Sequence, residues 1–198
     1  MESNYKFTIF TACFNSEPFI KRLYESLRAQ SFTDFEWLII DDCSQDSTRD
    51  ILATIEADAK FDVRIFYNDE NQMIASCCNF AVENALGQFF LFLDHDDELL
   101  PNALERFNDI WNNIPSSKKP FLAGMMSNCQ DQFGNYVDDE LPNSPIITDF
   151  YSLYYDLGIK GEKFFCYLTS IMKEHNFSTV DRYVPENVVL LNISDHYN

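Results

Sequence analysis

Acidic residues crowd one short stretch near the middle of the chain. Residues 94–98 read Asp-His-Asp-Asp-Glu, which places four carboxylates within five positions. Like charges this close repel, and one of them takes up a proton unless a cation lies between them. Oxygen ligands suit a hard ion such as Mg²⁺ or Mn²⁺, and Mg²⁺ commonly completes its shell with water and substrate phosphates. The stretch therefore predicts a metal site that receives a diphosphate. The alternative is a solvated acidic loop before the helix expected from Pro101.

The segments around this stretch alternate between strand and helix patterns through the first 115 residues. Such alternation predicts right-handed βαβ units and an α/β fold with a mainly parallel sheet. Strands are expected at residues 6–12, 35–40, 63–67 and 89–93. Helices are expected from Pro18 after a Ser16 cap, after a Ser47 cap, over residues 74–86 with Gly87 closing the helix, and over residues 101–114.

Three of the predicted strands end in groups that could do chemistry. Residues 11–15 close the first strand, Asp41 and Asp42 follow the second, and residues 94–98 follow the fourth. Ligands of parallel α/β sheets bind beyond the carboxyl ends of the strands. We therefore expect these three strand ends to form one site.

The pattern changes from residue 121 onward. A strand is expected over residues 121–128, a hairpin turn over residues 131–135, a helix over residues 170–175 and a final strand over residues 188–193. There is no internal repeat and no flexible linker. The sequence therefore predicts one domain over residues 1–198, with a parallel half over residues 1–115 and a mixed half over residues 116–198, the latter minimal or truncated.

Three stretches resemble the family 2 glycosyltransferases, which have the GT-A fold. Residues 8–15 (TIFTACFN) are similar to that family's first strand, and residues 31–48 (SFTDFEWLIIDDCSQDST) to its second strand and Asp-Asp-Gly-Ser turn. Residues 87–97 (GQFFLFLDHDD) resemble its metal motif, with the usual Gly-Glu replaced by Gly-Gln. The order and spacing of all three match. The resemblance implies a GT-A glycosyltransferase that uses a nucleotide-diphospho-sugar and Mn²⁺ or Mg²⁺.

The resemblance implies a nucleotide pocket at the first two strand ends. Asp42 would bind the base, which is expected to be uracil, with Asp41 beside it. Phe14 matches an aromatic position that stacks on the base, and Ala12 and Cys13 would line the pocket with backbone. A UDP-sugar is therefore the expected donor.

The resemblance also assigns roles to the acidic stretch. Asp94 and Asp96 would form the metal pair, with Asp96 the direct ligand and Asp94 nearer the ribose, while Asp97 would cap the next helix. Alternation along the strand end turns His95 away from the pair, although His95 as a ligand is an alternative. His196 lies where some relatives return a C-terminal group to the metal, the alternative being a surface tail.

A less specific similarity covers the end of the chain. Residues 161–163 and 167–173 resemble a Gly-Asp-Lys and an Arg-Thr-Ser-Val-Leu-Lys stretch of some members, and residues 182–186 resemble their Phe-Val-Pro-Glu segment. Glu186 matches the general base, which in an inverting transfer takes a proton from the incoming hydroxyl. The alternative for Glu186 is a surface carboxylate.

The sequence also departs from the family pattern. Cys43 replaces the usual glycine, so the turn must be reached without a positive φ or with strain. Met73 stands at another glycine position, and Cys78 or its neighbour stands where an arginine contacts the diphosphate. Without that arginine, donor affinity falls or another Lys or Arg substitutes. Two interpretations follow: an active transferase, or a catalytically weak nucleotide-sugar-binding or scaffold protein derived from one.

The composition excludes other classes. A formal charge of −18 leaves no basic patch for nucleic acid. Residues 11–15 lack the glycines and basic residues that a nucleotidyltransferase would need. No apolar run approaches the roughly 20 residues of a membrane span, and the first residues lack a signal-peptide core, so a cytoplasmic protein with six free thiols is expected. The expected partners are a nucleotide-sugar donor and a glycan or lipid-linked acceptor, with peripheral membrane association and oligomeric state left open.

Overall fold

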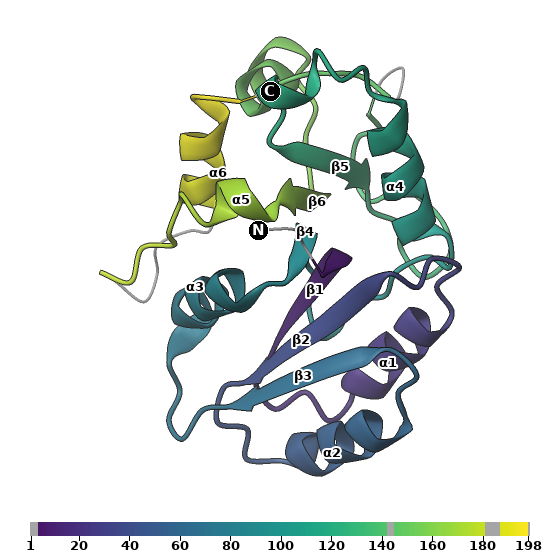
Figure 1. Ribbon diagram of the computed structural model, residues 1–198, viewed down its shortest axis with the longest axis vertical. Coiled ribbons are helices and arrows are strands. Elements are labelled where there is room, and N and C mark those ends of the chain that lie inside the picture. Colours follow the sequence, from purple (N-terminus) through teal and green to yellow (C-terminus); the bar gives the residue numbers. More distant parts are fainter. Residues whose placement is uncertain (1–3, 142–144, 181–186, 198) are drawn as a thin grey trace.

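A six-stranded sheet forms the centre of the computed structural model, which describes residues 4–141, 145–180 and 187–197 (Figure 1). The strand order is β3-β2-β1-β4-β6-β5. Neighbours among β1 to β4 run parallel, and β6 runs antiparallel to β4 and β5. This arrangement confirms the predicted α/β fold. The strands are β1 (Tyr5–Cys13), β2 (Phe35–Asp41), β3 (Asp62–Tyr67), β4 (Gly87–Phe92), β5 (Gly124–Asn128) and β6 (Lys163–Leu168).

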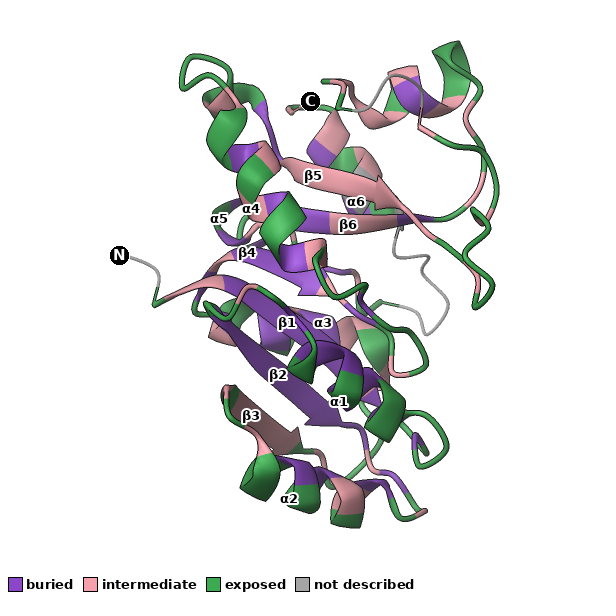
Figure 2. Cartoon of the chain, turned by 90° about the vertical axis from the view of Figure 1, so that its right-hand side faces the viewer, coloured by how far each residue is buried: buried purple, intermediate pink, exposed green. Residues whose placement is uncertain are grey.

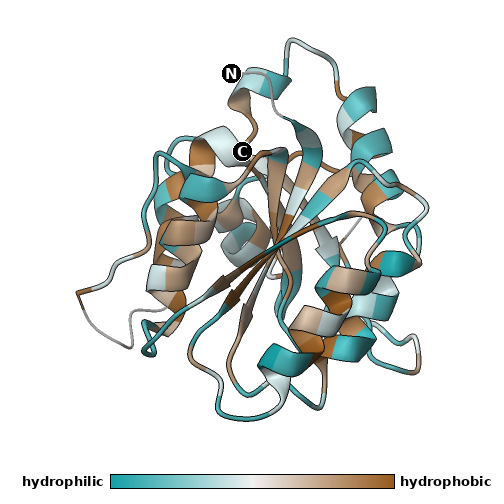
Figure 3. Ribbon diagram, turned by 60° about the horizontal axis from the view of Figure 1, so that its bottom comes forward, coloured by the Kyte–Doolittle hydropathy of each residue, from teal (hydrophilic) through white to brown (hydrophobic). Residues whose placement is uncertain are grey.

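Helices cover both faces of the sheet (Figure 3). One face packs around Phe7, Trp37 and Phe89 and is covered by α1, α2 and α4. The other face packs around Phe10 and Phe90 and is covered by α3, α5 and α6. Among the described helices, none is long and apolar enough to cross a membrane. The helices are α1 (Ile20–Arg28), α2 (Thr48–Asp58), α3 (Met73–Asn84), α4 (Ala103–Asn113), α5 (Thr169–Met172) and α6 (Asn187–Ser194).

Burial falls from the centre of the sheet toward its edges. All seven residues of β2 are buried, whereas the residues of β3 and β5 at the two edges are partly or fully exposed (Figure 2). A parallel strand covered by helices on both faces needs apolar side chains on both. The nearly continuous apolar run of β2 meets that need.

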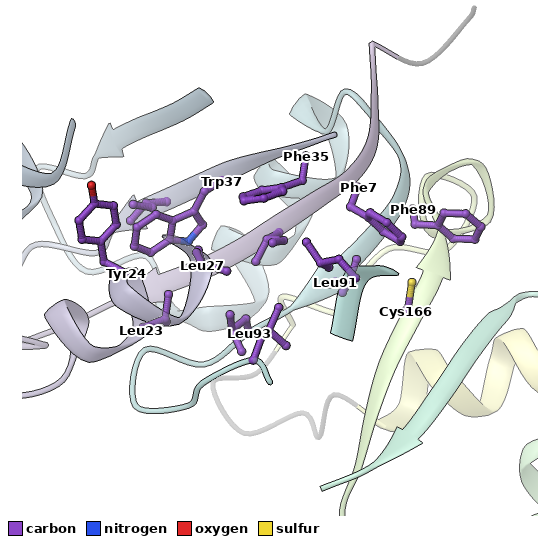
Figure 4. Packing of buried hydrophobic residues seen from close by; sticks show 14 of the residues in the cluster. Phe7, Leu23, Tyr24, Leu27, Phe35, Trp37, Phe89, Leu91, Leu93 and Cys166 are labelled. Atoms are coloured by element: carbon purple, nitrogen blue, oxygen red, sulfur yellow. The ribbon is translucent and has the colours of Figure 1, made fainter. Parts of the chain in front are cut away.

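A buried chain of hydrogen bonds fixes the strand ends that carry the site. Trp37 stacks on Tyr24 with ring centroids 6.3 Å apart (Figure 4), and its indole Nε1 donates to Oγ1 of Thr11 at 3.0 Å. The Thr11 hydroxyl donates in turn to the carbonyl of Leu93 at 2.8 Å. These bonds connect β2, β1 and the residue just before the acidic stretch. Buried polar groups that are all partnered rigidify a core.

A second buried network fixes the opposite end of the same strands. Glu36 is fully buried and accepts from Oγ1 of Thr8 at 2.6 Å, from the N–H of Leu86 at 2.8 Å and from Nη1 of Arg64 at 2.8 Å. Arg64 also donates to the carbonyl of Asn84 at 2.9 Å. The network joins β1, β2, β3 and the end of α3. A buried carboxylate is tolerated because it has these partners.

Two predicted helix boundaries in the first half were wrong. Helix α1 begins at Ile20 rather than Pro18, because the Ser16 hydroxyl accepts from the N–H of Phe14 instead of capping a helix. Helix α3 ends at Asn84, and Gly87 is the first residue of β4 rather than a helix-closing residue. A Cβ at this glycine would lie 2.3 Å from the backbone N of Thr8. The close approach of β1 therefore requires glycine there.

The second half differs more from the predictions. Residues 188–193 lie in helix α6 instead of a strand, and among its described side chains the buried ones are Val189 and Ile193, four residues apart. A spacing of four is typical of a helix, but residues 188–193 are almost all apolar, so their sequence shows no helical or strand periodicity. Strand β6 was not predicted, and β5 begins only at Gly124. The predicted hairpin turn is confirmed. The N–H of Gly134 donates to the carbonyl of Asp131 at 3.0 Å, and Gln130 and Tyr136 on either side of the turn form an antiparallel bridge.

Candidate functional site

The carboxyl ends of β1, β2 and β4 lie side by side at one edge of the sheet. The register places Cys13 beside Asp41, and the N–H of Asp42 donates to the carbonyl of Cys13 at 2.8 Å. On the other side of β1, the N–H of Leu93 donates to the carbonyl of Phe10 at 2.9 Å. The structure thus brings together the three polar strand ends.

Phe14 lies exposed on a loop that is tied to the loop after β2. The N–H of Asn15 donates to Oγ of Ser44 at 2.9 Å, and Oδ1 of Asn15 accepts from the N–H of Gln45 at 2.8 Å. The Phe14 side chain is 48% exposed. A large apolar ring held open to solvent on a fixed loop is available to stack on a flat ligand.

Ala12 and Cys13 contribute to the site from opposite faces of β1. Ala12 is partly buried and packs with the core on the α3 face. Cys13 is fully buried in the core on the α1 face, and burial raises the pKa of its thiol to about 12. Its carbonyl is occupied by the N–H of Asp42. The Cys13 side chain therefore packs in the core below the site, and Ala12 lies on the same face of the sheet as α3.

The carboxylate of Asp42 organises the loop between β3 and α3. Its Oδ1 accepts from Nδ2 of Asn68 and from the N–H of Gln72, both at 2.7 Å. Its Oδ2 accepts from the N–H of Met73 at 2.9 Å. A carboxylate offers about four lone-pair sites. The Cys77 thiol is a further partner, since the Asp42 charge and a hydrogen bond to Asp42 raise the pKa of this thiol after desolvation, so the described residues already supply about four partners to the carboxylate.

Asp41 lies on the opposite face of β2 from Asp42. It is fully buried, and its Oδ2 accepts from Nε of Arg49 at 2.6 Å and from the N–H of Ser44 at 3.3 Å. Its Oδ1 has no hydrogen-bond partner among the described residues. Asp41 therefore has no surface exposed to a nucleotide in this structure, and its contacts with Arg49 and Ser44 stabilise the turn after β2.

Two positions where the family has glycine keep a left-handed backbone here. Cys43 has φ 68° and Met73 has φ 67°. The loop residue Asn15 has φ 53°. A left-handed backbone costs most L-residues roughly 1–2 kcal/mol, and such strain clusters at functional sites. The turn at Cys43 is therefore reached with strain, one of the two outcomes expected from the sequence.

Asp94 and Asp96 lie exposed at the end of β4. Among the described residues, none makes a hydrogen bond or ion pair to either carboxylate. The protein on one side of Asp94 desolvates it, and this desolvation followed by the charge of Asp96 raises the pKa of Asp94. Two unengaged oxygen donors that repel each other fit a hard divalent cation. No group of three or more metal-binding side chains occurs among the described residues, so water or substrate oxygens would complete a shell.

Arg22 on α1 and Phe19 just before it contact the acidic stretch, and the sequence did not indicate them. The centroids of the Phe19 and His95 rings are 5.8 Å apart, which places His95 beside the residue that precedes α1. Arg22 donates from Nη2 to the carbonyl of Asp96 and from Nε to the carboxylate of Glu98 at 2.8 Å. No spacing rule could have linked Arg22 to a segment more than 70 residues away.

The start of β6 reaches the same edge of the sheet. The antiparallel pairing runs from Phe89 opposite Leu168 to Leu91 opposite Cys166, so the start of β6 is directed toward the carboxyl end of β4. Lys163 is 5% exposed and donates from Nζ to the carbonyl of Glu162 at 3.1 Å. The Glu162 charge also helps to raise the pKa of Asp97, after desolvation and the two neighbouring aspartates.

Two further residues were predicted to belong to the site. The expected base, Glu186, falls outside the described residues. His196 lies near His175, with ring centroids 6.5 Å apart.

Comparisons with known proteins place the chain among the glycosyltransferases. The model of the family described as glycosyl transferase family 2 matches residues 8–117. TuaG of Bacillus subtilis (strain 168), a glycosyltransferase by name assigned to teichuronic acid biosynthesis, is 32% identical over 172 residues. This match covers 84% of the chain and 62% of TuaG. The teichoic acid poly(glycerol phosphate) polymerase of Staphylococcus epidermidis is 32% identical over 108 residues, which are 54% of this chain and 15% of that protein.

Solved structures agree on the fold. The crystal structure of S. aureus TarS 1-349 in complex with UDP superimposes with a TM-score of 0.70 at 19% identity, and covers 96% of this chain and 55% of that one. At this identity the likeness establishes the fold, which is that of the GT-A glycosyltransferases. Since the family model matches more than half of its length, the chain belongs to glycosyl transferase family 2.

Proposed function

We propose that the chain binds a UDP-sugar at the edge formed by β1, β2 and β4 and transfers the sugar, with inversion, to an acceptor hydroxyl in a metal-dependent reaction. The observation that carries this proposal is the convergence of an exposed aromatic ring, a carboxylate that organises the adjoining loop and two free carboxylates. These groups belong to Phe14, Asp42 and the pair Asp94 and Asp96. Each suits one part of a nucleotide-sugar.

The nucleotide would occupy the wall between β1 and β2. Phe14 would stack on the base, and the Asp42 carboxylate would accept from the ring N–H of uracil in place of the Cys77 thiol. A carboxylate only accepts hydrogen bonds, so a base that presents a ring N–H suits this position better than one that presents only acceptors. The TarS structure in complex with UDP supports uridine as the nucleoside.

The diphosphate would lie by the end of β4. Asp94 and Asp96 would hold Mn²⁺ or Mg²⁺ there, with Asp96 the direct ligand and Asp94 nearer the ribose. When bound, the metal acts as a Lewis acid that stabilises negative charge on the leaving diphosphate. The buried chain from Trp37 through Thr11 to the carbonyl of Leu93 would keep the pair in place.

The acceptor side of the proposal rests on Glu186. In an inverting displacement this carboxylate would take the hydroxyl proton as the acceptor oxygen bonds to the anomeric carbon and the bond to the diphosphate breaks. Glu186→Gln should leave UDP binding unchanged and abolish transfer. Glu174→Gln, at an exposed residue after α5, is the control. Retained turnover in Glu186→Gln would remove Glu186 from this role.

The biological role is proposed from the relatives. The chain spans 62% of TuaG and a smaller share of the other relatives named, so the activity of the whole protein is a proposal. A place in teichuronic acid, teichoic acid or related glycan synthesis fits their names. Residues 1–115 would form the donor half and residues 116–198 the acceptor half of one domain, acting on a glycan or lipid-linked acceptor.

The decisive experiment is thermal unfolding with UDP or GDP, with and without Mn²⁺. UDP with Mn²⁺ should raise Tm, UDP alone should raise it less, and GDP should have little effect. Asp96→Ala should remove the metal-dependent part, whereas Asp109→Ala on the exposed side of α4 should not. Absence of any UDP shift in the wild-type protein would overturn the proposal.

A binding protein without catalysis is the second candidate, and one observation favours it. Helix α3, from which the family supplies a diphosphate-binding arginine, contains no Arg or Lys over Met73–Asn84. Metal-dependent hydrolysis of UDP-glucose, UDP-galactose or UDP-GlcNAc separates the two. An active transferase should release UDP slowly from one of them, whereas a pure binder should release none.

A further inference from the structure

Arg22 is in the first turn of α1, and two nitrogens of its guanidinium contact the acidic stretch. Nη2 donates to the backbone carbonyl of Asp96, and Nε donates to Oε1 of Glu98 at 2.8 Å. The planar guanidinium presents several N–H groups in a fixed fork, so one side chain can hold two acceptors in a defined relative position. Arg22 therefore contacts the predicted metal ligand, Asp96, through its backbone, and Glu98 two residues later through its side chain.

Phe19 completes the contact between α1 and the stretch. The Arg22 guanidinium lies 6.0 Å from the centroid of the Phe19 ring, and that ring lies 5.8 Å from the ring of His95. The stretch itself turns between Asp94 and Asp97, where the N–H of Asp97 donates to the carbonyl of Asp94 at 3.1 Å. Both central residues of this turn are therefore held from the start of α1: His95 by the ring of Phe19, just before the helix, and Asp96 by Arg22 through its carbonyl.

We propose that Arg22 is a positioning residue for the metal site, an inference that rests on the proposed function. A carbonyl held by Arg22 fixes the peptide plane after Asp96, and the plane sets the direction in which the Asp96 carboxylate leaves the backbone. Arg22 also pairs with Glu98, which keeps one further carboxylate out of the repulsion between Asp94 and Asp96. The role needs the fork rather than the charge alone, because lysine offers a single point charge.

The chain supplies a matched control in Arg28 on the same helix. Arg28 is similarly exposed, and among the described residues its ionic partners are Glu25 in its own helix and Asp58 at 3.9 Å, both away from the acidic stretch. Arg22→Ala, Arg22→Lys and Arg28→Ala should be compared by isothermal titration of Mn²⁺ at saturating UDP. Arg22→Ala and Arg22→Lys should weaken Mn²⁺ binding about tenfold or more, while Arg28→Ala should bind as the wild type.

A second readout needs no metal or nucleotide. In the metal-free protein, hydrogen exchange of the amides of residues 95–98 should speed up at least tenfold in Arg22→Ala and stay unchanged in Arg28→Ala. Exchange in the β2 amides should stay unchanged in both variants, which shows that the fold is intact. Wild-type exchange at residues 95–98 in Arg22→Ala would overturn the proposal, as would wild-type Mn²⁺ affinity in that variant. If wild-type protein fails to bind UDP with Mn²⁺, the proposed function fails, and the exchange experiment still decides the role of Arg22.

Discussion

Asn68 donates from its side-chain amide to Oδ1 of Asp42 at 2.7 Å, across the ends of β3 and β2. The backbone of Asn68 is held as well, since its N–H donates to the carbonyl of Asp41 at 2.9 Å and its own carbonyl accepts from Nη2 of Arg49 at 2.7 Å. The orientation of the Asp42 carboxylate is therefore set by a residue of the neighbouring strand end. In the proposed function, that orientation determines where the base would lie.

Removal of this amide should weaken UDP binding more than it weakens the fold. Asn68→Ala takes one charge-assisted hydrogen bond from Asp42, worth roughly 1.5–3 kcal/mol, and lets the carboxylate turn. We expect UDP affinity to fall about tenfold by isothermal titration. Asn112→Ala is the control, because Asn112 is exposed on α4 and bonds only to Asn108 among the described residues. Equal UDP affinities for the two variants would contradict the role of Asn68.

Glycine should relieve the strain at the two left-handed positions. Cys43→Gly and Met73→Gly remove a cost of roughly 1–2 kcal/mol in the folded state and add roughly 0.5–1 kcal/mol of chain entropy to the unfolded state. Each should therefore raise the free energy of unfolding by up to about 1 kcal/mol in urea at an unchanged m-value.

Alanine at the same positions is the control for this gain. Cys43→Ala and Met73→Ala keep the side-chain carbon that makes φ 68° and φ 67° unfavourable, so neither should stabilise the protein. Equal stability of the glycine and alanine variants would show that the turn carries no strain.

The pair between Glu36 and Arg64 should be strongly coupled. Arg64→Met leaves the fully buried Glu36 carboxylate without its cation, and breaking a buried pair costs about 3 kcal/mol or more. The double variant Glu36→Gln with Arg64→Met should recover part of that loss, because the uncompensated charge is gone. The measurement is the free energy of unfolding by denaturant, with Arg28→Met, which breaks an exposed pair, as the control. Additive losses in the double variant would contradict the coupling.

Metal binding by Asp94 and Asp96 should depend on pH at values higher than those at which an ordinary carboxylate titrates. Desolvation, then the charge of Asp96, raises the pKa of Asp94, and the proton competes with the metal. Mn²⁺ affinity should therefore fall as the pH drops from 7, beginning above the ordinary aspartate value of about 3.9. In the metal-free protein the sign is opposite: a carboxyl whose pKa is raised by folding destabilises the fold when ionised, and this cost is relieved as the pH falls through the raised pKa.

Carboxyl NMR of the metal-free protein checks this assignment directly. Asp94 should titrate above the ordinary value, and Asp96→Asn should lower the pKa of Asp94 because one neighbouring charge is removed. An unchanged Asp94 titration in Asp96→Asn would show that the two carboxylates do not interact.

The sequence by itself determined the parallel half and the position of its candidate site. The strands and helices of residues 6–114 follow from local periodicity, and parallel strands separated by helices must present their carboxyl ends at one edge. Phe14, Asp42 and the acidic stretch could therefore be grouped from their places after predicted strands, and the family follows from the same residues. Glu186 as the base stays a prediction.

Only the tertiary structure decided which residues surround that site. Strand alternation separated Asp41, buried with Arg49, from Asp42, and the antiparallel insertion of β6 beside β4 brought Lys163 to the same edge. The contact of Arg22 with Asp96 joins residues 74 positions apart in the sequence. Local periodicity determines how a segment folds and which face it buries, but it holds no information on which distant segment packs against that face. That choice depends on the packing of the whole sheet and its helices.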